Sequence, residues 1–200
     1  MSKLVKLLVF TLALVPASLL ARALYSGNLG VNPAETLQLE TGIWTLRFLI
    51  VTLAVTPLRR VTGWNRLIQY RRMLGLFAFF YGALHFASYV VLDQYFSLEG
   101  MLADVTKRPF ITAGFVAFAS MLPLAVTSTR GWIRRLGRRW QLLHRLVYVA
   151  AAAGAVHYLW KVKVMAGSPV YYAAIVGFLL AFRIVWSLRT PRPLSSVRPS

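Results

Sequence analysis

Six long apolar stretches constrain this 200-residue chain more than any other feature. They cover residues 5–24, 42–58, 73–92, 109–127, 143–160 and 169–187. Each approaches the roughly 20 residues that an α-helix needs to cross the hydrocarbon of a bilayer. Only 14% of the residues are charged, whereas about a quarter are charged in an average soluble domain. We therefore predict an all-α, polytopic membrane protein that folds as a six-helix transmembrane bundle.

The connections between these stretches alternate in charge. Arginines and lysines fill the N-terminus, the loops 59–72 and 128–142, and the C-terminal tail. The other connections hold all five carboxylates of the chain, which are Glu35, Glu40, Asp93, Glu99 and Asp104. Four basic residues also lie there, but the imbalance remains large. Because short loops rich in Lys and Arg stay in the cytoplasm, we predict that both termini are cytoplasmic.

Composition excludes several classes of function. The net charge of +18 is spread over short inter-span loops, and this distribution argues against a nucleic-acid partner. The chain has no cysteine, so it has no disulfide, zinc–cysteine site or cysteine-held iron–sulfur cluster. No glycine-rich nucleotide fingerprint and no internal repeat is evident.

The two ends of the chain allow further expectations. The first 23 residues resemble a signal peptide, with Lys3, Lys6 and an apolar stretch before Ala21-Arg22-Ala23. We expect an anchoring first span instead, because five further spans follow, although cleavage would leave the remaining topology unchanged. Residues 191–200 are polar and contain proline, and we predict a short disordered cytoplasmic tail.

The three histidines are the strongest candidates for chemistry. His85 lies in the third stretch, and His144 and His157 lie in the fifth. Ionisable residues in a membrane usually face the bundle interior and mark functional sites. A single histidine could instead be structural, with a hydrogen bond to a neighbouring helix as its only role. Three histidines on two spans, with no membrane carboxylate to pair with, favour cofactor ligation instead.

The spacing places two of these histidines at one depth. His85 follows the Arg71–Arg72 pair by about as many residues as His157 follows His144. Facing helices of a bundle are where cofactor ligands converge, so His85 and His157 can hold one haem iron from two sides. His144, near the inner face, could hold a second haem. On an ideal helix, however, His144 and His157 differ by about 140° in azimuth.

Glycines precede two of the histidines by three residues. They are Gly82 before His85 and Gly154 before His157. A helical side chain leans over the preceding turn, so a glycine there leaves room for a flat macrocycle. The alternative is that these glycines serve only close helix packing, for which small residues are common in membranes.

Several segments resemble one protein family. They are Thr41-Gly-Ile-Trp-Thr-Leu-Arg-Phe-Leu, Thr56-Pro-Leu-Arg-Arg, Arg71-Arg-Met-Leu-Gly, Leu84-His-Phe-Ala-Ser-Tyr, Trp140-Gln-Leu-Leu-His-Arg-Leu-Val-Tyr and Val156-His-Tyr-Leu-Trp. This is the MsrQ (YedZ) family of haem-binding membrane subunits of periplasmic protein-methionine-sulfoxide reductases. The chain is more distantly similar to the transmembrane domain of ferric reductases and NADPH oxidases. The resemblance runs from about residue 40 to 187, and we take residues 1–190 as one ferric-reductase-like domain.

The resemblance implies an electron-transfer subunit in a bacterial inner membrane. Such a subunit takes electrons from the quinone pool or a cytosolic flavin reductase and passes them to a periplasmic molybdopterin enzyme that repairs oxidised methionines. It implies one or two haems b with His85, His144 and His157 as iron ligands, and it also implies FMN, to which we assign no residues. The oxidase pattern has a fourth histidine where this chain has Arg71, which makes Arg71 a candidate partner of an inner haem. Arg145 is a candidate contact for a haem propionate, because guanidinium matches carboxylate geometry.

Two alternatives to this function stay open from the sequence. One is a stand-alone ferric or quinone reductase, and the other is a small transporter whose histidines relay protons. A transporter usually needs membrane carboxylates or broken helices, and neither is evident. The chain also shows no acid–base pair or nucleophile arrangement for bond-making chemistry, so we expect an electron-transfer subunit without a substrate-converting site of its own.

Overall fold

The computed structural model describes residues 3–162 and 167–189, and within them it contains helices and no strand. Six helical segments are long and apolar enough to cross a membrane. They are Lys3–Tyr25, Pro33–Thr62, Arg71–Asp93, Pro109–Val126, Arg138–Val162 and Ser168–Arg189. The predicted six-span, all-α fold is thus confirmed. The predicted tail, residues 191–200, lies outside the described residues, and the orientation of the termini stays a prediction.

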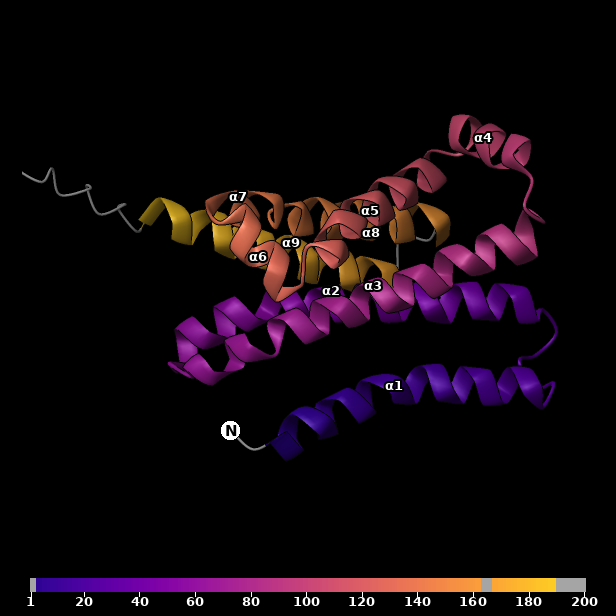
Figure 1. Cartoon of the computed structure of the whole chain (residues 1–200). Coiled ribbons are helices and arrows are strands. Elements are labelled where there is room, and N and C mark those ends of the chain that lie inside the picture. Colours follow the sequence, from indigo (N-terminus) through magenta and orange to yellow (C-terminus); the bar gives the residue numbers. More distant parts are fainter. Residues whose placement is uncertain (1–2, 163–166, 190–200) are drawn as a thin grey trace, which may run out of the picture.

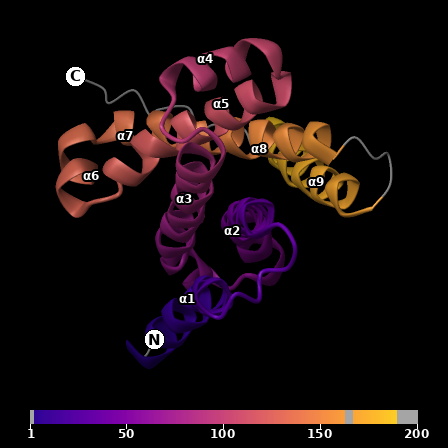
Figure 2. The same cartoon turned by 90° about the vertical axis from the view of Figure 1, so that its right-hand side faces the viewer.

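The helices form a bundle of roughly antiparallel neighbours (Figures 1 and 2). In chain order they are α1 (Lys3–Tyr25), α2 (Pro33–Thr62), α3 (Arg71–Ser88), α4 (Leu98–Lys107), α5 (Pro109–Val126), α6 (Arg130–Leu136), α7 (Arg138–Leu143), α8 (Leu146–Val162) and α9 (Ser168–Arg189). A 3-10 helix η1 (Asn65–Gln69) precedes α3, and a π-helix η2 (Tyr89–Asp93) continues it. The most extensive contacts join α2 to α3 and α5 to α8. These two pairs form the centre of the molecule, with α1 against one side and α9 against the other.

The two ends of the bundle differ in charge, and we name them accordingly. The acidic end holds the α1–α2 connection, α4 and the last turn of α8, at the right of Figure 1. The basic end holds η1, α6 and α7, with their arginines. This segregation agrees with the pattern of charges in the sequence.

Helix α2 is the longest element, and local signals set its bounds. Asn32 caps its N-terminus by accepting a hydrogen bond from the Glu35 amide at 3.2 Å, and Pro33 fits the first helical position. Gly63 ends it in the left-handed conformation, with φ of 71°. The helix is therefore longer than the predicted span 42–58, which it contains. Thirty residues rise about 45 Å, so α2 extends beyond the hydrocarbon at its ends.

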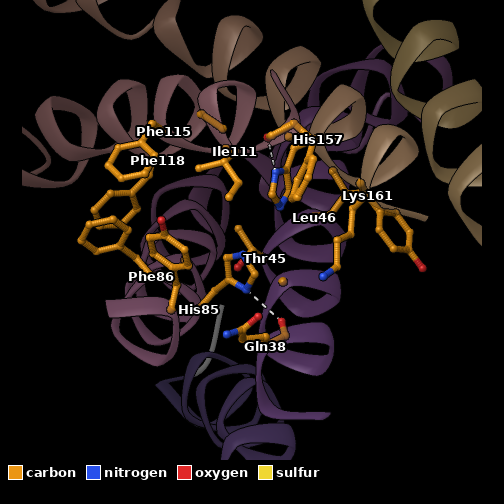
Figure 3. Close-up of a pocket in the computed structure, with 18 of the residues that line it drawn as sticks. Gln38, Thr45, Leu46, His85, Phe86, Ile111, Phe115, Phe118, His157 and Lys161 are labelled. Atoms are coloured by element: carbon orange, nitrogen blue, oxygen red, sulfur yellow. Dashed lines mark hydrogen bonds between the residues drawn. The ribbon is translucent and has the colours of Figure 1, made fainter. Parts of the chain in front are cut away.

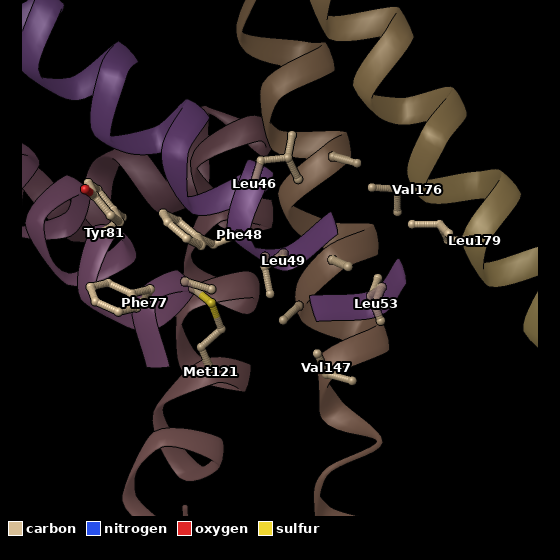
Figure 4. Packing of buried hydrophobic residues seen from close by; sticks show 14 of the residues in the cluster. Leu46, Phe48, Leu49, Leu53, Phe77, Tyr81, Met121, Val147, Val176 and Leu179 are labelled. Atoms are coloured by element: carbon tan, nitrogen blue, oxygen red, sulfur yellow. The ribbon is translucent and has the colours of Figure 1, made fainter. Parts of the chain in front are cut away.

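The buried core lies between the two central helix pairs (Figure 4). Small residues permit close approach there, since Ala78, Ala150 and Ala151 are fully buried. Leu49, Leu53, Phe77 and Met121 fill the space around them. Tyr81 is also fully buried, and it binds α1: its hydroxyl donates to the Ala13 carbonyl at 2.8 Å and accepts from the Ala17 amide at 3.0 Å. The core thus fixes α3 against α1 and α2, one turn before His85.

The fifth predicted span is broken, which the sequence did not indicate. Helix α7 ends at Leu143, His144 and Arg145 form a turn, and α8 begins at Leu146. The azimuth calculated for an ideal helix therefore does not apply between His144 and His157.

Candidate cofactor-binding site

Two imidazoles from different helix pairs face each other across a cavity (Figure 3). His85 comes from α3 and His157 from α8. Their ring centroids are 5.8 Å apart, with an interplanar angle of 76°. The predicted convergence of these two histidines at one depth is therefore found in the structure.

A backbone carbonyl of a neighbouring helix holds each of these imidazoles. His85 Nδ1 lies 2.8 Å from the carbonyl oxygen of Gln38 on α2, and His157 Nδ1 lies 2.6 Å from that of Phe110 on α5. A carbonyl oxygen only accepts hydrogen bonds, so each ring donates from Nδ1. Nε2 is then left as the nitrogen with a lone pair. Histidines that bind metals are oriented in this way, with the other ring N–H given to a carbonyl or carboxylate.

A glycine beneath each imidazole makes this approach possible. A Cβ added to Gly42 on α2 would lie 3.1 Å from His85 Nδ1, and one added to Gly114 on α5 would lie 2.8 Å from His157 Nδ1. Both separations are shorter than the 3.4 Å at which ordinary contact begins. Each glycine is four residues, or about one helical turn, after the residue whose carbonyl accepts the bond. The carbonyl and the glycine thus form one cradle for each ring.

The two cradles are related by a constant offset in the sequence. Gln38 and Phe110, Gly42 and Gly114, and His85 and His157 are each 72 residues apart. Gly82 and Gly154 have the same offset. The pair α2–α3 and the pair α5–α8 are therefore structural repeats, which corrects the expectation that the chain has no internal repeat. The four cradle residues were missed in the sequence, and this offset between histidines and glycines is the signal that could have found them.

The cavity between the imidazoles is mostly apolar and measures about 190 Å³. Leu46, Phe86, Phe115 and Phe118 are among its lining residues. Gly82 and Gly154 also line it. A Cβ added to Gly154 would meet no atom closer than 3.9 Å, so this glycine leaves room for a ligand, whereas one added to Gly82 would lie 2.9 Å from the Met121 methyl group, so Gly82 serves close packing against α5. Charged groups occur towards the acidic end, where Glu35, Asp93, Arg108 and Lys161 contribute.

This arrangement fits two axial ligands of one metal. A metal–imidazole nitrogen bond is about 2 Å long and a ring nitrogen lies about 1 Å from its centroid, so two axial rings are expected roughly 6 Å apart. The observed 5.8 Å agrees. Among the described residues no group of three or more His, Asp or Glu side chains could hold a bare ion. A metal here would need equatorial ligands from a flat macrocycle, as in haem, and the apolar lining beside Gly154 suits such a group.

His144 lies in a second cavity, of about 530 Å³, at the basic end. Arg71, Arg72 and Arg145 line it with His144, and none of the residues that line it is acidic. The His144 ring stacks on Trp140, with centroids 3.8 Å apart, and its Nδ1 lies 3.1 Å from the Trp140 carbonyl oxygen. The 72-residue offset pairs His144 with Arg72, so α3 supplies no histidine opposite it. The structure thus brings Arg71 and Arg145 to His144 and separates them from the His85–His157 pair.

Comparisons with known proteins agree with this architecture. Residues 41–155 match the family described as "Ferric reductase like transmembrane component". The chain therefore belongs to the ferric-reductase-like class of transmembrane proteins. No solved structure matches it significantly.

Curated relatives define the family more narrowly. A protein of Herminiimonas arsenicoxydans is 51% identical over 92% of this chain and 86% of its own length. One of Azospira oryzae is 49% identical over 98% of this chain and 86% of its own. One of Brucella anthropi is 46% identical over 96% and 87%, respectively. All three are named "Protein-methionine-sulfoxide reductase heme-binding subunit MsrQ", and this chain belongs to the MsrQ family. It is thus a multi-pass membrane protein of an electron-transfer family.

Proposed function

We propose that this chain carries electrons across a bacterial inner membrane through one haem b held by His85 and His157. The observation that supports this most strongly is the facing pair of imidazoles, each with Nδ1 bonded to a carbonyl and Nε2 left for a ligand. The relatives named as haem-binding subunits support the same cofactor. When bound, haem supplies a one-electron redox couple, and the protein sets its ligation and burial.

The residues around this pair have separable tasks. The Gln38 and Phe110 carbonyls fix the tautomer and orientation of the imidazoles. Gly154 leaves room beside them, and the phenylalanines keep the cavity apolar. His144 is the third predicted haem ligand, but it has no opposing histidine. We therefore assign one haem to the chain and a different task to the basic-end cavity.

We propose that the basic-end cavity is where electrons enter. Its lining combines His144, Arg71 and Arg145 with the rings of Trp140 and Tyr148. Such a surface suits a planar, polar electron donor. A quinol from the membrane pool and the flavin of a cytosolic reductase are donors of this kind. An FMN, which the family resemblance implies, has the same chemical character. Leu49 and Met121 line both cavities, so only a thin layer of side chains separates the two sites.

The proposed orientation places the basic end in the cytoplasm, by the distribution of arginines. The acidic end then faces the periplasm, where the recipient is a soluble molybdopterin-dependent methionine-sulfoxide reductase that repairs oxidised proteins. The relatives' printed names support the sulfoxide reductase as partner. Membership of this family favours electron transfer over the proton-coupled transporter.

Purified protein in proteoliposomes tests this function. We expect a reduced menaquinol or ubiquinol analogue, or reduced FMN, to reduce the haem, as followed in the visible spectrum. Adding the periplasmic reductase with methionine sulfoxide should then reoxidise it. Reoxidation by Fe(III) citrate at the same rate as by the reductase would favour the stand-alone ferric reductase. If neither donor reduces the haem, the proposed entry route is wrong.

A further inference from the structure

Lys161 lines the cavity of the imidazole pair but has no role in the proposed ligation of the metal. It lies on α8 four residues after His157, which is about one turn closer to the acidic end and on the same face of the helix. It lines the cavity of the imidazole pair, and Figure 3 shows its ammonium group pointing into that cavity on the side of His85. The ammonium nitrogen also lies 5.9 Å from the centroid of the Phe110 ring.

The other cation that lines this cavity already has a partner. Arg108 Nε lies 3.2 Å from a carboxylate oxygen of Asp104. The second oxygen of Asp104 accepts hydrogen bonds from Gln94 at 2.8 Å and Tyr89 at 3.1 Å. In the described part of the chain, no carboxylate lies within ion-pair distance of Lys161. Lys161 is thus the cation lining this site that no carboxylate of the described residues neutralises.

Haem has two propionate carboxylates on one edge, and these are its only charged substituents. An ionised carboxylate in a membrane is costly unless a cation or polar groups accompany it. The apolar walls around His85 and His157 offer no such group, whereas the end of the cavity with Lys161 does. We propose that Lys161 binds a haem propionate and fixes the macrocycle with its carboxylate edge towards the acidic end. This assignment rests on the proposed haem and differs from the sequence-based expectation, in which Arg145 contacts a propionate.

The lysine also tunes the redox equilibrium. Reduction adds one negative charge to the haem, and a nearby cation favours the more negative state. A unit charge about 10 Å away, at an effective dielectric constant of about 20, shifts a one-electron equilibrium roughly tenfold. A tenfold shift is about 59 mV for such a couple. Removing the Lys161 charge should therefore lower the midpoint potential.

The test compares three variants of the full-length protein by spectroelectrochemical titration. Lys161→Gln should shift the one-electron reduction equilibrium of the haem about tenfold towards the oxidised form, which lowers the midpoint potential by about 59 mV. It should also speed the transfer of haem to excess apomyoglobin. Lys161→Arg keeps the charge, and its midpoint potential and rate of haem transfer should both equal those of wild type. Lys107→Gln removes the same charge from the end of α4, at a residue that does not itself line this cavity, and should match wild type. Equal shifts in Lys107→Gln and Lys161→Gln, or none in Lys161→Gln, would overturn the assignment.

Haem dimethyl ester gives a second, independent readout. Its propionates are neutral, so in protein reconstituted with it the wild type and Lys161→Gln should release haem at equal rates. A difference as large as with native haem would mean that Lys161 acts without the propionate, and the assignment would be wrong. Failure of the proposed function is distinguishable, because wild-type protein would then bind no haem through His85 and His157.

Discussion

Adding one methyl group at Gly114 should disturb haem binding more than adding it at Gly42, the glycine of the other cradle. In Gly114→Ala the new Cβ would lie 2.8 Å from His157 Nδ1, so the ring or α5 must move by about 0.6 Å to reach ordinary contact at 3.4 Å. In Gly42→Ala the separation from His85 Nδ1 is 3.1 Å, and about half that movement suffices. Both rings also hold hydrogen bonds to carbonyls on the same helices, which limit their retreat.

The expected loss of haem affinity follows from the hydrogen bond that His157 must weaken. If His157 retreats, its bond to Phe110 lengthens or breaks, and a buried hydrogen-bonding group left without a partner costs about 1–3 kcal/mol. Loss of the groups that orient a metal ligand typically lowers affinity about 10–100-fold. We expect a decrease in that range for Gly114→Ala and a few-fold decrease for Gly42→Ala.

The assay is the rate of haem transfer from detergent-purified protein to excess apomyoglobin. Gly177→Ala is the matched control, because nothing lies within 4 Å of the added Cβ. Alanine favours helix over glycine by about 1 kcal/mol, so a loss in Gly114→Ala cannot come from helix propensity. If Gly114→Ala released haem as slowly as Gly177→Ala, the cradle would not orient the ligand, and the reasoning would be refuted.

Three further predictions concern the surroundings of the site. Gly154→Ala should keep haem, since the added Cβ would meet its nearest neighbours at 3.9 and 4.0 Å, whereas Gly154→Phe should fill the cavity and abolish haem absorbance. Tyr81→Phe removes a hydroxyl that bonds two backbone groups of α1, and it should lower the free energy of unfolding by about 1–3 kcal/mol in an SDS titration while haem content stays the same. His144→Gln should also retain haem but slow its reduction by quinol more than tenfold in stopped-flow measurements; an unchanged rate would remove His144 from the entry site.

The fold could be predicted from the sequence because membrane spans are set by length and composition. The apolar stretches and the segregation of charge were sufficient to locate all six. The break at His144 was not predictable in this way, because Leu142, Leu143, Leu146 and Val147 are apolar on both sides of it. A turn between two apolar segments leaves no mark in a hydropathy pattern.

The two histidines of the site could be predicted from the sequence, but the groups that orient them could not. His85 and His157 stood out because histidine is rare in membrane helices and because their depths agree. Their supporting contacts use the carbonyls of Gln38 and Phe110, and a backbone group can belong to any residue type. The cradle glycines could have been found only from the 72-residue offset, since few other positions of the two repeats carry the same residue.

Haem content per chain tests the central claim most directly. Pyridine haemochrome quantification of wild type, His85→Ala, His157→Ala and His144→Ala, each shown to be folded by size-exclusion chromatography, gives this value. We predict one haem b per chain in wild type and in His144→Ala, and none in the other two variants. Full haem content in His85→Ala or His157→Ala, or loss of haem in His144→Ala alone, would contradict the assignment of the axial pair.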